Sequence, residues 1–202
     1  MALQHDALVE GCSRILLSRP CQKICFPWQG QVISGKGYRS VVMALLESRI
    51  QVKTGALPDD AGGLYDSKQN LLVLHPMFNP DDIFFQMTLV HEATHAIQDM
   101  QFAGHSLWRL DGEAAAYIAE QLFVLFSPPP ENPSPFLTER SDPIRTRAAK
   151  IAKVIAANPM ASIDQKTSQD LRDAILNTDL YTVSIVLDPW EAEDGVPASR
   201  FP

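Results

Sequence analysis

The amino-acid sequence predicts an α+β fold in which a small β-sheet precedes the longest helices. Short apolar runs bounded by turn-forming residues, as in strands, lie between residues 50 and 74. Beyond them, apolar residues recur mainly at helical spacing. At 202 residues, the chain has the length of one domain, or of one domain with an appendage.

The N-terminal part contains two predicted helices separated by an irregular segment. Residues 2–18 carry a roughly one-sided apolar set that ends at Pro20, and Tyr38–Arg49 has a face of valines and leucines. Cys21–Gly37 is rich in turn formers and is predicted to be irregular. Its segment Ser34–Gly37 is predicted to be a turn, because it lacks the spacing of a phosphate-binding loop.

Three short strands are predicted next, at Ile50–Thr54, Gly62–Tyr65 and Leu71–Leu74, with a polar turn through Asp66–Asn70. The last strand is continuously apolar, so both of its faces should be covered. The edge of this sheet is expected to be able to hold an extended peptide by strand addition.

The segment Thr88–Gln98 reads TLVHEATHAIQ and contains the pattern HExxH. His91 and His95 are four residues apart, so on a helix both imidazoles can face one metal ion. Glu92 lies about 100° further around the helix, where it can take a proton from a water at that metal. The spacing therefore indicates a zinc site with a general base.

The flanking sequence predicts that this segment is a buried helix. Asn79 and Pro80 offer an N-cap and a first helical residue, and no proline or glycine follows before about Phe102. The helix is apolar nearly all round, which is typical of burial. Buried histidines need a partner: zinc is one, and backbone groups in a plain core helix are the alternative.

A second polar set lies on the predicted helix Glu113–Phe126, which follows a short connection at Ala103–Leu110. Its alanine-rich first half allows close packing, and Glu113, Tyr117 and Glu120 share one face. Glutamates on such a helix are expected to be paired or metal-bound. Four residues are candidates for a third zinc ligand: Glu113, Glu120, His105 and Asp111. His75 is a weaker candidate, since it is a lone histidine before a proline.

TLVHEATHAIQ followed by DGEAAAYIAEQ resembles the gluzincin class of zinc metallopeptidases, over about residues 60–126. The resemblance implies a zincin-like core that consists of a small sheet, an HExxH helix and a third-ligand helix. It implies that His91, His95 and Glu113 bind zinc, and that Glu92 is the general base of peptide-bond hydrolysis.

The sequence departs from this class at one position. Many gluzincins carry an aspartate four residues after the ligand glutamate, where this chain has Tyr117. Tyr117 is therefore expected to hydrogen-bond near the metal or the substrate. It is a candidate donor to the tetrahedral intermediate, together with His105 and Arg109. The metzincin pattern HExxHxxGxxH is not met.

A proline-rich spacer at residues 127–135 divides the predicted domains. Residues 1–126 form the predicted metallopeptidase core, and residues 136–202 a mostly helical extension. Two helices are predicted in this extension, at residues 142–157 and 168–177. The pattern at 181–187 fits either a strand or a helical turn. Residues 191–202 are expected to be loose.

Composition restricts partners and location. The net charge is −7 without a long basic run, which argues against nucleic acid or an anionic membrane as partner. No segment resembles a secretory signal or a transmembrane helix. The three cysteines, Cys12, Cys21 and Cys25, suggest reduced thiols and a cytoplasmic protein, although signal-independent secretion is compatible with the sequence. Oligomeric state is left open.

The expected function is that of a zinc-dependent metallopeptidase acting on protein or peptide substrates. Two alternatives remain: a metal-stabilised protein-binding module with little turnover, and a protease effector or toxin with a narrow target.

Overall fold

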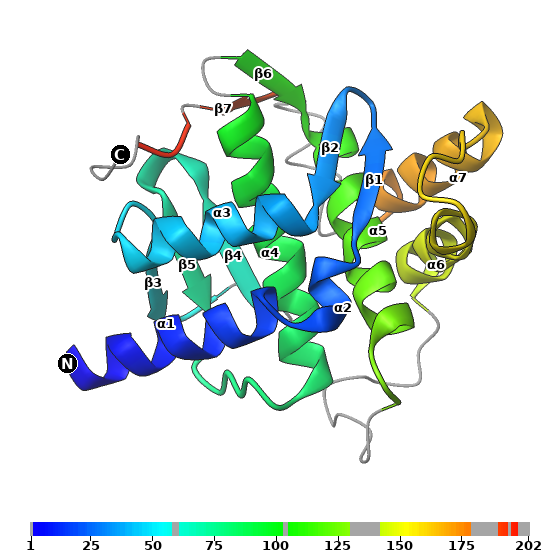
Figure 1. Ribbon diagram of the computed structural model, residues 1–202. Coiled ribbons are helices and arrows are strands. Elements are labelled where there is room, and N and C mark those ends of the chain that lie inside the picture. Colours follow the sequence, from blue (N-terminus) through cyan, green and yellow to red (C-terminus); the bar gives the residue numbers. More distant parts are fainter. Residues whose placement is uncertain are drawn as a thin grey trace.

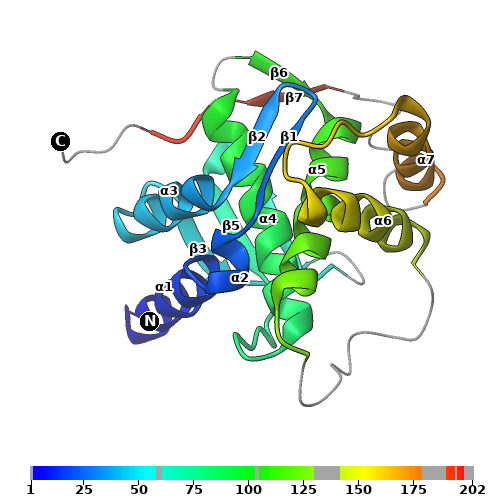
Figure 2. The same cartoon turned by 45° about the vertical axis from the view of Figure 1, so that its right-hand side comes forward.

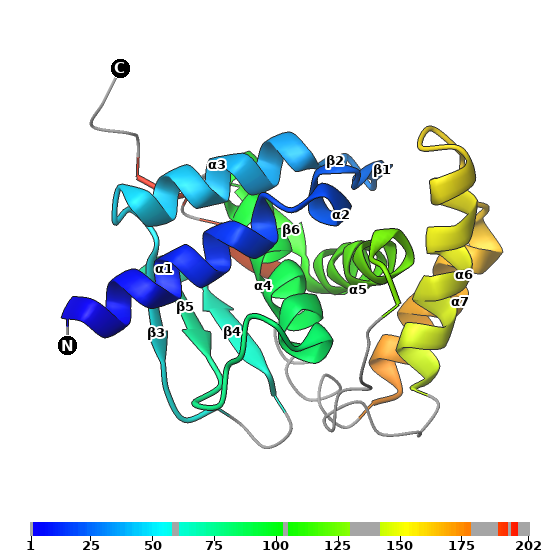
Figure 3. The ribbon, with the colours of Figure 1, turned by 60° about the horizontal axis from the view of Figure 1, so that its bottom comes forward.

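The computed structural model describes residues 2–57, 61–102, 105–129, 142–178, 190–193 and 195–197, and its architecture is α+β (Figure 1). Helices α1 and α3 lie over one face of a small sheet, and α4, α5 and the pair α6 and α7 follow one another away from it (Figure 3). In chain order the elements are α1 (Ala2–Leu16), α2 (Arg19–Gln22), β1 (Cys25–Trp28), β2 (Gln31–Ser34), α3 (Gly35–Leu46), β3 (Gln51–Thr54), β4 (Gly63–Asp66), a 3-10 turn (Ser67–Gln69), β5 (Leu71–Leu74), α4 (Ile83–Gln101), β6 (His105–Trp108), α5 (Arg109–Phe126), α6 (Pro143–Ala157), α7 (Gln165–Leu176) and β7 (Trp190–Glu193).

The central sheet has the order β3-β5-β4, with β3 parallel and β4 antiparallel to β5. The three predicted strands are confirmed to within one residue at each end. Every residue of β5 is buried, as its continuous apolar sequence predicted. Strand β4 is an edge of the sheet, and its neighbour beyond that edge is α4.

The segment Cys21–Gly37 is more regular than its composition predicted. Strands β1 and β2 form a hairpin whose two loop residues, Gln29 and Gly30, have φ angles of 46° and 83°. Positive φ at both positions is the condition for the tight turn that matches strand twist. Ser34–Gly37 is also not a free turn: it begins α3, and the Ser34 side chain accepts a hydrogen bond from Gly37 N at 3.3 Å.

Helices α3, α4, α5 and α7 begin three or four residues from their predicted starts. Helix α4 is capped by Asp82, which accepts from Phe84 N at 2.8 Å, whereas Asn79 accepts from Asp81 N in the turn before it. Helix α5 begins at Arg109. The predicted connection Ala103–Leu110 therefore contains strand β6 and the first residues of α5. None of the described helices is long and apolar enough to cross a membrane.

The C-terminal helices share the hydrophobic core with the rest of the fold, and α6 packs along α5 (Figure 2). Their buried apolar residues are Ile144, Ala148, Ile151, Ala152, Ile155, Leu171, Ala174 and Ile175. Strand β7 pairs antiparallel with β6, so the expectation of a loose tail is wrong at 191–193. The segment Tyr181–Leu187 lies outside the described residues.

Candidate metal centre

Helix α4 places the two histidines of the HExxH pattern one turn apart on the same face. The ring centroids of His91 and His95 are 5.1 Å apart. His91 is buried, with 7 % of its surface exposed, and His95 is only partly accessible. The apolar surroundings predicted from the sequence are present, because the helix is buried along most of its length.

Glu113 lies in the first part of α5 and faces both imidazoles. Its Oε2 is 3.3 Å from His91 Nε2, and its Oε1 is 3.7 Å from His95 Nε2. The three residues each offer one ligand atom, and these atoms all lie within 4.8 Å of one another. The helix pair α4 and α5 therefore brings together a group that could hold a metal ion.

A neutral network holds the His95 ring from its other nitrogen. Gln98 Oε1 lies 2.9 Å from His95 Nδ1, and Gln98 Nε2 donates to Gly112 O at 3.1 Å and to Gln31 Oε1 at 2.6 Å. A backbone carbonyl only accepts, so the Gln98 amide nitrogen must face Gly112. Its carbonyl oxygen then faces His95, where it fixes the proton on Nδ1 and leaves Nε2 for a metal.

A charged network lies behind the His91 ring. Its Nδ1 is 3.6 Å from Oε2 of Glu120, whose side chain is 1 % exposed, and Glu120 Oε1 accepts from Arg145 Nε at 2.6 Å. Tyr117 packs edge-on against the imidazole, with ring centroids 4.7 Å apart. The predicted role of Tyr117 as a donor to the substrate stays a prediction.

Electrostatics in this cluster favour a positive charge. Burial lowers the pKa of His91, but the carboxylates of Glu113 and Glu120 outweigh it and raise the pKa to about 10. Burial likewise raises the pKa of Glu120, but His91 and Arg145 lower it overall. The cluster therefore favours a positive charge between its carboxylates, and His91, His95 and Glu113 could hold a metal ion there.

Glu92 points away from α5 and towards the sheet. Its Oε2 accepts a hydrogen bond from Tyr65 N of β4 at 2.9 Å, and the residue is largely buried. Gly63 makes this approach possible: a Cβ atom there would lie 2.9 Å from Glu92 Cγ and 3.0 Å from Thr88 Cγ2. The predicted base therefore contacts the edge strand of the sheet.

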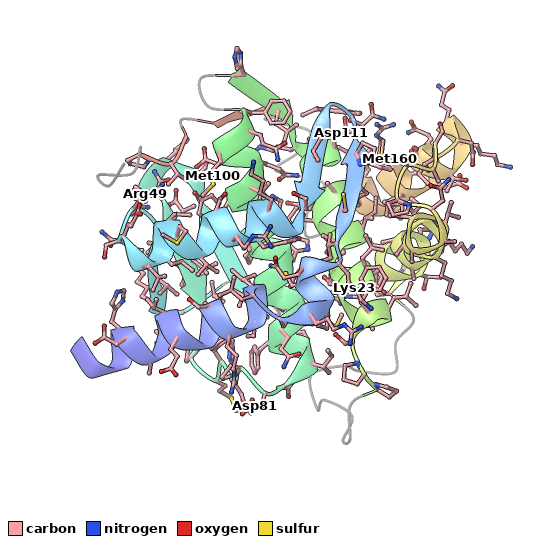
Figure 4. All side chains as sticks on the ribbon, in the orientation of Figure 1. Lys23, Arg49, Asp81, Met100, Asp111 and Met160 are labelled. Carbon is pink, nitrogen blue, oxygen red and sulfur yellow. The ribbon has the colours of Figure 1, made fainter. Side chains whose placement is uncertain are left out.

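The other candidate ligands lie outside the cluster of ligand atoms found among the described residues. Asp111 is buried and receives two hydrogen bonds from Arg172 of α7, at 2.9 and 2.6 Å; Figure 4 labels it beside the β1–β2 hairpin. His105 is exposed on β6. His75 Nδ1 accepts from Met77 N at 3.1 Å, and its ring stacks on Phe85.

The cysteines also lie outside the cluster. Cys12 and Cys21 are buried thiols of the core, and Cys25 is exposed. Burial raises the pKa of Cys12 to about 12, so this thiol stays protonated. Arg109 is the first residue of α5, and its predicted role as a donor stays a prediction.

Sequence reasoning missed Gln98 and Arg145 as members of this site. Gln98 is three residues after His95, so helical spacing alone could have indicated the contact. Glu120, a candidate ligand, lies outside the group of ligand atoms and faces His91 Nδ1 instead. Arg145 is far along the chain, on α6, and no local pattern links it to the metal cluster.

Comparisons with known proteins give no further assignment. No protein-family model matches the chain, and searches of curated proteins and of solved structures return no significant match.

Proposed function

We propose that this chain is a zinc-dependent metallopeptidase with a zincin-like core, in which His91, His95 and Glu113 bind the metal and Glu92 is the general base. The observation that carries the proposal is the convergence of the three ligand atoms within 4.8 Å. Two nitrogens and one carboxylate oxygen are a donor set that suits catalytic zinc.

The orientation of the imidazoles supports the fit of zinc to this group. Gln98 and Glu120 face the Nδ1 atoms of His95 and His91, so both Nε2 atoms are turned towards Glu113. Among the described residues, the group contains three protein ligands. A fourth position left for water or substrate is typical of catalytic sites, whereas structural zinc sites have four protein ligands. This favours an enzyme over a metal-stabilised binding module.

The proposed mechanism is hydrolysis of a peptide bond. A bound zinc supplies Lewis acidity for the scissile carbonyl and lowers the pKa of a water at the site. Glu92 takes the proton of the attacking water and delivers it to the leaving amine. The hydrogen bond from Tyr65 N holds one oxygen of Glu92, so the other oxygen serves as the base. Strand β4, which carries Tyr65, therefore lies directly beside the proposed base.

The test compares three forms of the purified protein. The wild type should bind about one zinc ion per chain, because the chain has one proposed three-ligand site, and it should cleave peptides. Glu92→Gln should keep the zinc and lose hydrolysis, because the amide cannot take a proton. Glu113→Ala should lose zinc. Hydrolysis that persists in Glu92→Gln would rule out the proposed base, and a proteome-wide cleavage profile would separate a general peptidase from a narrow-target effector.

A further inference from the structure

We propose that Arg145, on α6, is a positioning residue of the metal centre that acts through Glu120 on His91. The inference rests on the proposed metal site and extends it to a helix beyond the α4–α5 pair that supplies the three ligands. It makes helix α6 part of the metal site.

Glu120 is a buried carboxylate whose two oxygens have different partners. Its side chain is 1 % exposed, so it needs compensating charge or hydrogen bonds. Oε1 accepts from Arg145 Nε at 2.6 Å and from Gln121 Nε2 at 3.1 Å, and Oε2 faces His91 Nδ1. Because Arg145 engages one oxygen, the carboxylate is fixed with the other towards the imidazole.

Arg145 is itself held in place at the start of α6. Its Nη1 donates to Asp142 Oδ2 at 3.1 Å, and Asp142 caps the helix by accepting from Ile144 N at 2.8 Å. The guanidinium thus spans two carboxylates with two of its nitrogens. A lysine has one ammonium group and cannot reproduce this fork, so the position depends on arginine geometry as well as on charge.

The consequence for His91 is a defined ring orientation. A carboxylate behind Nδ1 sets the tautomer and directs Nε2 to the metal, and loss of such a partner typically weakens metal binding about 10–100-fold. The His91–Glu120 distance of 3.6 Å is longer than a hydrogen bond. Zinc binding at Nε2 is expected to shorten this contact, since the metal makes the Nδ1 proton a stronger donor.

A second ion pair provides a matched control. Arg172 of α7 binds Asp111 of α5 at 2.6 Å, and both side chains are about as buried as those of the metal cluster. This pair also links a C-terminal helix to α5, but Asp111 lies outside the group of metal-ligand atoms. Loss of Arg172 should therefore lower stability without the same loss of zinc affinity.

The experiment measures zinc affinity of the full-length protein by competition with a chromophoric chelator. Arg145→Met should weaken zinc binding about 10–100-fold, and Arg145→Lys should restore part of the loss. Arg172→Met should stay within about threefold of the wild type, since its partner Asp111 lies outside the group of ligand atoms. Urea unfolding of each variant shows which of them fold. If Arg145→Met does not fold, the zinc affinity of Arg145→Lys decides the test.

A double-mutant comparison establishes the route through Glu120. Glu120→Gln alone should weaken zinc binding about as much as Arg145→Met, and adding Arg145→Met to it should cost about twofold or less. Additive losses, or equal effects of Arg145→Met and Arg172→Met, would overturn the inference while the metal site stands. A wild-type protein that binds no zinc would overturn the proposed function and, with it, this inference.

Discussion

The two sides of helix α4 meet their neighbours through different kinds of contact. Towards α5, His91 and His95 face the carboxylate of Glu113. Towards β4, Glu92 accepts a hydrogen bond from the backbone of Tyr65, and Gly63 leaves room for its methylene groups. The contact with α5 depends on the charge and protonation of the side chains. The contact with β4 depends on the room left by Gly63 and on the direction of the Tyr65 N–H group.

This difference divides the expected effects of substitutions. Changes on the α5 side should alter metal affinity and its dependence on pH, because the imidazoles and carboxylates there bind either a proton or a metal. Changes on the β4 side should alter turnover while the metal is retained, because they move the proposed base without touching the ligands. The predictions below test this division, from the largest expected effect to the smallest.

The largest effect is expected for the metal-free protein at alkaline pH. The neighbouring carboxylates raise the pKa of His91 from 6.5 to about 10 despite burial. A pKa raised by folding stabilises the native state fully below about pH 6.5, and this contribution is lost as pH rises through about 10. One pKa unit corresponds to about 1.4 kcal/mol, so the free energy of unfolding should fall by on the order of a few kcal/mol.

Urea unfolding of the metal-free protein across this range measures the loss, and His91→Asn provides the baseline for other titrating groups. Zinc-saturated protein should not show the loss, because the metal replaces the proton at Nε2. The unfolding free energy could instead stay constant over this pH range, or fall as steeply in His91→Asn as in the wild type. Either result would contradict the claim that contacts on the α5 side depend on charge.

The sequence predicted the local part of this arrangement. The spacing of His91, Glu92 and His95 within one helix fixes their relative directions, so the roles proposed for them follow from helix geometry. Glu113 required the resemblance to known metallopeptidases, and the structure places it with the two histidines. The strands around β5 were also predictable, because their apolar runs are short and bounded by turns.

The remaining contacts join residues that are distant in sequence. Glu120 was recognised as an unusual glutamate, but its partner Arg145 comes from a helix after the proline-rich segment, and nothing in the spacing links them. The pairing of β6 with β7 has the same character, since α5, α6 and α7 separate the two strands in the sequence. Long-range pairing depends on how helices pack, which local periodicity does not encode.

On the β4 side, Gly63→Ala is predicted to impair turnover with zinc retained. The added Cβ would lie 2.9 Å from Glu92 Cγ, closer than van der Waals contact, so β4 or Glu92 must shift. Overpacking of this kind costs about 1–3 kcal/mol of stability. A displacement of the base by about 1 Å can lower kcat by about 10²-fold. Peptidase kinetics and zinc affinity, measured on the same preparation, check both halves of this prediction.

Gly55→Ala is the matched control for the sheet. Among the described residues, a Cβ atom there would meet Val73 Cγ1 of β5, at 3.2 Å, and would not reach Glu92. This variant should keep its activity. If Gly63→Ala lost zinc in proportion to activity, the two sides of α4 would not act separately.

The smallest effect is expected for Gln98→Leu, which removes the neutral support of His95. Zinc affinity should fall about tenfold, the lower end of the range for such partners, because an amide fixes the ring but adds no charge. Gln101→Leu is the control. Gln101 is also on α4, where its side-chain amide accepts from Val32 N and donates to Val32 O of β2. Chelator competition should show normal zinc affinity for Gln101→Leu. An equal loss in both variants would mean that docking of α4 on β2, and not the orientation of His95, sets the affinity.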